Sequence, residues 1–340
     1  MNRRFTLLSA IVAASILLTV ITQPARAQIT SGACLGENRI AAMQRDEPSR
    51  YLAMLDRLSE IRNGTGILWK IEKPGIADSV LFGATPAHDV RALLQLARIK
   101  PFLARSRIAV VEIDYIHIDP AKTKNTIQAL SLLPEGESLN RNLSDDESRV
   151  LEKLVEDMGM NWDIARRIRP NFLMFMLGVP VCQQFATPEK DHFLEAVIVE
   201  MALKADIPVT AMDKIEDQFA AFAGLDPEIQ LAAIVEAADI GPKWWQDRAE
   251  TLIALYSEGR VGLMSAWPEA EGDRHPAWAR AQENIRARLI EDRSPAMLEK
   301  AMGELMNGGA FVSVNAQHLP GDTGFVELIR KRGFSVTPIK

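Results

Sequence analysis

Four residues that can bind a metal ion or carry a proton stand within or directly after short apolar segments. Glu112 lies within IAVVEID, and His88 follows LFGATPA. Asp213 ends IPVTAMD, and His318 follows AFVSVNAQ. Carboxylates and imidazoles ligate divalent cations, and they also act as general acids and bases. These residue types therefore indicate acid–base or metal-assisted chemistry, provided that the fold brings them together.

Six short runs rich in β-branched residues predict the strands that would position these groups. Segments with helical spacing separate most of the runs, and this alternation is typical of an α/β sheet. From about residue 120 to 306 the chain is mostly helical, with one strand inside that region. Helix starts are predicted there at Asp119-Pro120, at Asp226-Pro227 and at Ser144 with Glu147. We expect a single domain over residues 28–340. The predicted strands cover residues 66–71, 79–83, 108–113, 207–212, 310–314 and 334–339.

Glu112 is the candidate that most needs an explanation. Its run is apolar enough to be buried, and a buried carboxylate without a partner is energetically costly. In open α/β sheets, ligands bind at the carboxyl ends of the strands, so groups far apart in sequence converge there. We therefore expect a metal ion or a histidine beside Glu112, and Asp114 on the same face of the strand.

The other candidates have structural alternatives. Asp89 and Asp213 are typical helix N-caps, and the sequence favours capping over chemistry for both. His318 has the alternative of an exposed histidine with no ligand role. The remaining histidines lack a nearby acidic cluster or face away from one, and they are interpreted as structural: His117, His192 and His275.

Three segments resemble the TraB/GumN family, which is related to the Tiki proteases: GILWKIEKPG…VLFGATPAHDVR, IAVVEID and AFVSVNAQHLPGDTGFVELIRKRGFSVTPI. The resemblance covers nearly all of residues 34–340. It implies an α/β fold with a central mixed sheet and a large helical insertion. It also implies a divalent-metal site built from two G-x-x-H loops and a strand glutamate. Tiki-type members are described as metal-dependent proteases.

The family motifs transfer to this chain only in part. Glu112 matches the strand glutamate, and His318 matches the histidine of the second loop. In the first loop Pro86 stands where the family has histidine, and His88 follows two residues later. Asn315 replaces the glycine that opens the second loop, and asparagine is the next most tolerant residue for a left-handed backbone.

Two further segments have drifted from the family pattern. EDRSPAM resembles a D-R-N-x-x-M stretch, in which Arg293 is kept and Ser294 replaces the asparagine. Asp213 stands where members commonly have a glutamate.

These residues are compatible with two functions. In the first, the protein is a hydrolase in which Glu112, His318 and His88 hold a divalent cation of unknown identity. Glu112 could instead act as the general base, and Arg293 would stabilise the developing oxyanion. Peptides are the substrate class that the related proteases suggest. In the second, the domain is non-catalytic and binds a peptide, a glycan or an envelope partner in the former cleft.

The N-terminus predicts export to the periplasm or the exterior. Residues 1–27 have a positive start, an apolar run and an A-R-A cleavage site, which is typical of a signal peptide. Cleavage removes three arginines and no acid, so the formal charge goes from −6 to −9, which argues against nucleic-acid binding. No later apolar run is long enough to span a membrane. Cys34 and Cys182 are then the only cysteines, which indicates a disulfide.

Overall fold

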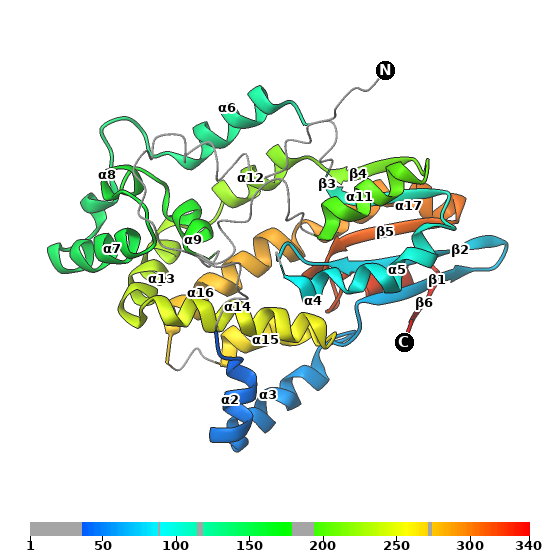
Figure 1. The fold of residues 1–340 in the computed structure, drawn as a ribbon, viewed down its shortest axis with the longest axis horizontal. Coiled ribbons are helices and arrows are strands. Elements are labelled where there is room, and N and C mark those ends of the chain that lie inside the picture. Colours follow the sequence, from blue (N-terminus) through cyan, green and yellow to red (C-terminus); the bar gives the residue numbers. More distant parts are fainter. Residues whose placement is uncertain (1–35, 88, 114–117, 179–193, 271–273) are drawn as a thin grey trace.

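The computed structural model describes residues 36–87, 89–113, 118–178, 194–270 and 274–340. Within them, the strands form one six-stranded mixed sheet in the order β4-β3-β5-β2-β1-β6 (Figure 1). The central mixed sheet is therefore confirmed. The strands are β1 (Leu68–Lys73), β2 (Ile76–Ala84), β3 (Ile108–Ile113), β4 (Val209–Asp213), β5 (Ala310–Asn315) and β6 (Ser335–Pro338).

All six predicted strands are present; β3 has the predicted bounds, and the other five differ from the prediction by one to three residues at one or both ends. β1 and β2 form an antiparallel hairpin in which Lys73 pairs with Ile76. Gly75 takes a positive φ of 79° in the turn, a conformation that favours glycine. The hairpin therefore extends both strands toward the turn, and β2 starts three residues earlier than the sequence predicted.

The four strands that carry candidate residues run parallel to one another. β5 pairs with β2 on one side and β3 on the other, and β3 pairs with β4. Ala84 is opposite Asn315, and Ile113 is opposite Asp213. Because parallel neighbours end at the same edge, the segments that follow β2, β3, β4 and β5 meet at one edge of the sheet.

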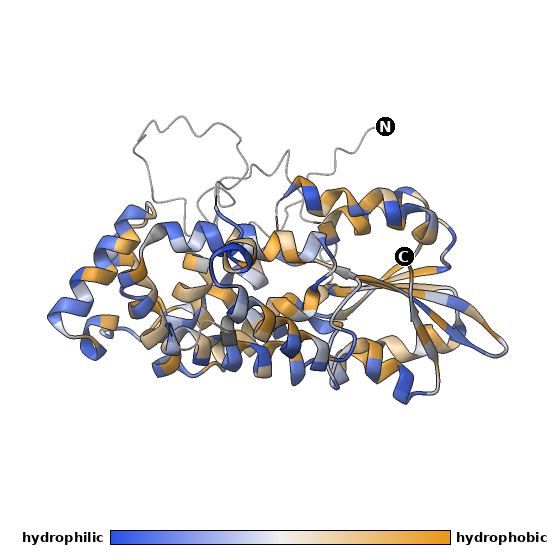
Figure 2. Ribbon diagram, turned by 90° about the horizontal axis from the view of Figure 1, so that it is seen from below, coloured by the Kyte–Doolittle hydropathy of each residue, from blue (hydrophilic) through white to orange (hydrophobic). Residues whose placement is uncertain are grey.

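Helices cover both faces of the sheet, as the view in Figure 2 shows. α5 contacts α11, while α17 contacts α18, β3, β4 and β5. Apolar side chains from the sheet and these helices form the larger buried core, which includes Phe82, Phe311 and Phe325. The sheet is therefore buried on both sides, which is why its parallel strands read as continuous apolar runs.

The helical insertion predicted over residues 120–306 is confirmed, with β4 inside it (Figure 1). It has its own buried core, in which the rings of Trp244, Trp245 and Trp278 pack edge to face with centroids 4.7–5.1 Å apart. These tryptophans therefore pack against one another inside the insertion.

The helices and short helical turns follow the chain in this order. Those before β4 are α2 (Arg39–Asp46), α3 (Pro48–Glu60), α4 (Val90–Leu93), α5 (Gln95–Leu103), α6 (Pro120–Ser131), η1 (Leu139–Asn142), α7 (Asp145–Asp157), α8 (Trp162–Ala165), α9 (Pro170–Gly178) and α11 (Leu194–Lys204). Those after it are α12 (Ile215–Ala223), α13 (Pro227–Ile240), α14 (Pro242–Ser257), α15 (Val261–Ala270), α16 (Pro276–Ile285), η2 (Arg286–Glu291), α17 (Ser294–Asn307), η3 (Ala316–His318) and α18 (Phe325–Lys331).

Local capping signals set several helix starts where the sequence places them. Asp119 and Asp226 accept hydrogen bonds from backbone N–H groups in the first turns of α6 and α13, each ahead of a proline at N1. Ser144 and Glu147 form a capping box at α7. These caps fix where the insertion helices begin, and packing decides how they are arranged.

Several sequence predictions fall on residues outside the described part. The signal peptide over 1–27, Cys34 and Cys182 all lie there, so export and the disulfide stay predictions. Among the described residues, no helix is both long enough and apolar enough to cross a bilayer.

Gly83, near the end of β2, packs directly under the turn that carries His318. A Cβ at this position would lie 2.5 Å from Leu319 Cδ1 and 2.9 Å from Ala316 Cα. The carbonyl of Gly83 also accepts a hydrogen bond of 2.9 Å from the buried Tyr256 hydroxyl. This glycine is needed because β2 and η3 approach too closely for any side chain.

Replacing Gly83 with alanine should therefore destabilise the protein by about 1–3 kcal/mol, because the added methyl forces β2 away from η3. Urea unfolding of the two proteins measures this difference. Gly303→Ala is the matched control, since nothing lies within 4 Å of its Cβ position in α17. That control should gain up to about 1 kcal/mol from helix propensity. Equal stability of Gly83→Ala and the wild type would contradict the packing argument.

Candidate active site at the carboxyl ends of the parallel strands

The Glu112 carboxylate is buried, with 4% of the residue exposed, and has partners from two distant segments. Its Oε2 accepts a hydrogen bond of 2.9 Å from the backbone N–H of Asn315, directly after β5. Its Oε1 lies 3.3 Å from Arg293 Nη2 and 3.8 Å from His318 Nε2. The backbone N–H of Glu112 donates to Glu195 Oε1 at 2.9 Å. The carboxylate thus has the partners that its burial requires.

His318 lies in η3, which follows β5, and is 1% exposed. The alternative of an exposed histidine is therefore wrong, because the turn folds under β2 and α17. Its Nδ1 lies 2.7 Å from Ser294 Oγ. Burial lowers the pKa of the His318 imidazole, and the Glu112 charge only partly opposes this effect. The ring is therefore neutral at neutral pH, and its Nε2 faces Glu112.

Arg293 links the strand carboxylates to the start of α17. It follows the π-helical segment η2, and its Nη1 donates to the Leu289 carbonyl at 3.1 Å. Its Nη2 donates to Asp213 Oδ2 at 2.8 Å and to Glu112 Oε1 at 3.3 Å. One guanidinium therefore bridges two carboxylates at the ends of neighbouring strands. Its buried Nε has no hydrogen-bond partner in the described part of the chain.

Asp213 does not cap a helix, so the favoured interpretation from the sequence is wrong. It is the last residue of β4, and α12 begins at Ile215 with Lys214 as its N-cap. Its Oδ1 accepts from the Lys214 N–H and lies 3.4 Å from Lys300 Nζ. Burial raises its pKa, but the hydrogen bond and charge of Arg293 outweigh burial, so the pKa is lowered overall. Asp213 therefore holds Arg293 in the site.

The described part of the first loop makes its polar contacts with residues other than Glu112 and His318. Asp89 accepts from the Arg91 N–H at 2.8 Å and caps α4, which confirms its capping role. Arg91 also pairs with Asp89 and Glu250, and its guanidinium lowers the pKa of the Asp89 carboxyl. The helix predicted over 90–104 is split at Leu94 into α4 and α5. His88 lies outside the described residues, so its ligand role stays a prediction.

Of the three histidines interpreted as structural, only His275 lies among the described residues. His275 is the N-cap residue of α16 and packs against the Trp244 ring, with centroids 6.2 Å apart. It is a structural residue, as expected. His117, His192 and Asp114 lie outside the described residues.

Two residues of the site were not singled out by the sequence for any role there. Glu195 is a buried acid in the apolar helix α11, and it accepts from the Glu112 backbone. The lone first-turn acid in LEAVIVEMALK is the signal that could have found it. Ser294 was noted only as a replacement for asparagine, although it touches His318.

The described residues supply two donor atoms that fit a divalent cation. His318 Nε2 is buried without a hydrogen-bond partner in this part of the chain, and it faces Glu112 Oε1 at 3.8 Å. Two ligand atoms each about 2.0–2.2 Å from one ion lie at most about 4.4 Å apart. No group of three or more His, Cys, Asp and Glu ligands occurs among the described residues, so a third ligand would come from outside them.

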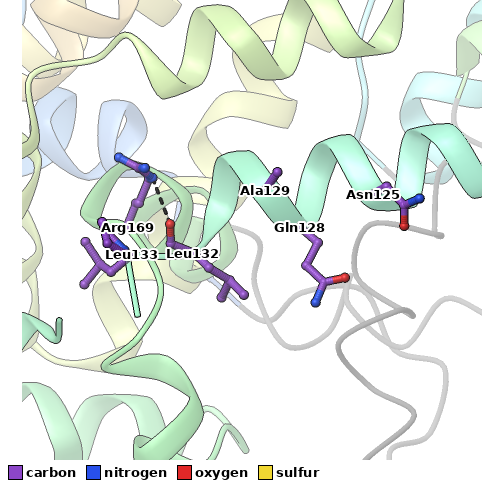
Figure 3. A pocket seen from close by; sticks show the side chains of 7 residues that line it. Asn125, Gln128, Ala129, Leu132, Leu133 and Arg169 are labelled. Carbon is purple, nitrogen blue, oxygen red and sulfur yellow. Dashed lines mark hydrogen bonds between the residues drawn. The ribbon is translucent and has the colours of Figure 1, made fainter. Parts of the chain in front are cut away.

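A separate hollow of about 440 Å³ lies in the helical insertion (Figure 3). It is lined by the end of α6 and by Arg169, whose Nε donates to the Leu132 carbonyl at 3.0 Å. None of the candidate site residues lines this hollow, and its single guanidinium is already engaged. It is therefore not part of the site described above.

Replacing Arg293 with methionine should destabilise the protein by about 3–5 kcal/mol, because the buried Glu112 carboxylate then loses its arginine partner and Asp213 keeps only Lys300. Urea unfolding in the presence of a chelator measures this loss without any contribution from metal ions. Arg288→Met is the matched control: its ion pair with Asp292 is exposed, so its loss should cost about 0.3–0.5 kcal/mol. A loss in Arg293→Met no larger than in the control would mean that the pairing contributes nothing.

Comparisons with known proteins agree with the motifs. The model of the TraB/PrgY/gumN family matches residues 67–338, which is most of the chain and includes Glu112, Asp213, Arg293 and His318. Neither the comparison with curated proteins nor that with solved structures returns a match. On the strength of the family match, the chain belongs to the TraB/PrgY/gumN family.

Proposed function

We propose that this protein is a divalent-metal-dependent hydrolase that cleaves amide or ester bonds. The observation that carries the proposal is the buried, unpartnered Nε2 of His318, which faces Glu112 Oε1 at 3.8 Å. A neutral imidazole nitrogen beside a carboxylate oxygen is a typical pair of ligand atoms for such a cation. Peptides are the substrate class that the likeness to Tiki-type proteases suggests.

Each residue has a specific role in this proposal. Glu112 and His318 would hold the cation, with His88 as the predicted third ligand. A bound divalent cation would polarise the scissile carbonyl and lower the pKa of a water molecule. Asn315 N–H holds Glu112 Oε2, which leaves Oε1 directed at the cation or at a proton to be removed.

Arg293 would donate to the oxyanion that develops on the substrate. Two of its nitrogens are held by protein oxygens, so the guanidinium is fixed before substrate binds. Its Nε has no acceptor among the described residues but is shielded from solvent, so a substrate oxygen would reach this donor only after neighbouring side chains move. Fixed donors of this kind stabilise charge in the transition state without reorganising during the reaction.

The second candidate function is a non-catalytic domain that binds a peptide, a glycan or an envelope partner. The observation in its favour is that Arg293 and Lys300 together carry two positive charges beside Glu112 and Asp213, so these charges balance without a metal cation. Pro86 in place of the first-loop histidine points the same way. In either case we propose export through the predicted signal peptide, with action in the periplasm or outside the cell.

Metal analysis of residues 28–340, purified without a histidine tag, tests the proposal. We expect a stoichiometric divalent metal in the wild type and loss of that metal in His318→Gln, because half of the described ligand pair is gone. His275→Gln is the matched control, since this histidine packs against Trp244 away from Glu112. Hydrolysis of a peptide library should follow the metal content.

The melting temperature in chelator separates the two candidate functions. Removal of a metal that binds only the folded protein lowers the melting temperature by mass action. Wild-type protein that contains no metal, and that melts at the same temperature with and without chelator, would support the non-catalytic domain instead.

A further inference from the structure

Ser294 is fully buried between two groups that compete for its hydroxyl. Its Oγ lies 2.7 Å from the Ile290 carbonyl oxygen and 2.7 Å from His318 Nδ1. A hydroxyl has one hydrogen to donate and two lone pairs to accept. The carbonyl can only accept, so the serine hydrogen is directed to Ile290, one helical turn back along the chain. The remaining bond needs a hydrogen on His318 Nδ1.

We infer that Ser294 is a positioning residue that holds His318 in the Nδ1–H tautomer, with the unprotonated Nε2 presented to Glu112. The Nδ1–H donates to Ser294 Oγ, and Ser294 donates to Ile290. The chain of hydrogen bonds therefore starts at a helix carbonyl and ends at the candidate ligand atom. Since His318 is buried, no solvent competes for either ring nitrogen.

The opposite tautomer, with the proton on Nε2, leaves no hydrogen between Ser294 Oγ and the Ile290 carbonyl oxygen, and it leaves the Nε2–H without an acceptor. If Ser294 donated to Nδ1, its oxygen would face the Ile290 oxygen at 2.7 Å with no hydrogen between them. The Nε2–H would then have only Glu112 Oε1 at 3.8 Å, which is too long for a hydrogen bond. A buried donor without an acceptor costs about 1–3 kcal/mol. The contacts of Ser294 with Ile290 and with the ring therefore favour Nδ1–H.

This tautomer is the one that a metal-binding histidine uses. Ligand histidines usually donate their second ring N–H to a protein oxygen, which fixes the ring orientation. Ser294 would supply that oxygen in this chain. The consequence for metal binding rests on the function proposed above, whereas the tautomer follows from the hydrogen bonds alone.

Nitrogen-15 NMR of the histidine rings tests the tautomer on metal-free protein. In the wild type, His318 should show a protonated Nδ1 and an unprotonated Nε2, and its signals should vanish in His318→Gln. Ser294→Ala should shift the ring toward the Nε2–H tautomer or a mixture, because the acceptor is gone. Ser294→Thr keeps the hydroxyl and should restore the wild-type signals.

Ser313→Ala is the matched control. It removes another fully buried hydroxyl, one that has no hydrogen-bond partner among the described residues. Its His318 signals should equal those of the wild type. The inference is overturned if wild-type His318 carries its proton on Nε2, or if Ser294→Ala leaves Nδ1–H unchanged. The wild-type spectrum alone decides the tautomer if Ser294→Ala does not fold.

Calorimetric titration with Zn²⁺ alone tests the consequence for the proposed function. Ser294→Ala should weaken Zn²⁺ binding about 10–100-fold, the usual effect of losing a residue that orients a ligand, and Ser294→Thr should recover most of it. Wild-type protein that shows the Nδ1–H tautomer but binds no Zn²⁺ would refute the metal-dependent function and leave the tautomer standing. Wild-type protein that binds Zn²⁺ although His318 carries its proton on Nε2 would refute the tautomer and leave the metal-dependent function standing.

Discussion

The burial of the Glu112 carboxylate is the constraint on which the site depends. β3 lies inside the sheet and is covered by helices, so its carboxylate has little access to water. A charge in that position is tolerated only when counter-charges and hydrogen-bond donors surround it. Here the donors are the backbone of Asn315 and the guanidinium of Arg293.

That constraint gives the helical insertion a structural role in the site. The chain leaves the sheet after β3, returns for β4, and leaves again before α17 brings Arg293 and Ser294 against the strand ends. Asp213 at the end of β4 completes the arrangement, because one carboxylate could not alone hold a guanidinium between two strands. The insertion therefore contributes the ion pair of Asp213 and Arg293 to the site, and its helices also cover the sheet.

The electrostatics of the site have two parts with different chemistry. Arg293, Lys300, Asp213 and Glu112 form a nearly balanced charged network. His318 and Ser294 form a neutral, buried pair beside it. A cation bound between His318 Nε2 and Glu112 Oε1 would connect the neutral pair to the charged network.

The sequence by itself determined the strands, the helix caps and the need for a partner at Glu112, because alternation, apolar runs and side-chain caps act over a few neighbouring residues. It placed Asp119, Asp226 and Ser144 correctly for that reason. Only the tertiary structure decided which groups partner Glu112, since Arg293 and Asn315 are 181 and 203 residues away. The tertiary structure also decided that Asp213 binds Arg293 instead of capping a helix, because this depends on the register of β3 and β4. It decided that His318 is buried, because this depends on how η3 packs under β2.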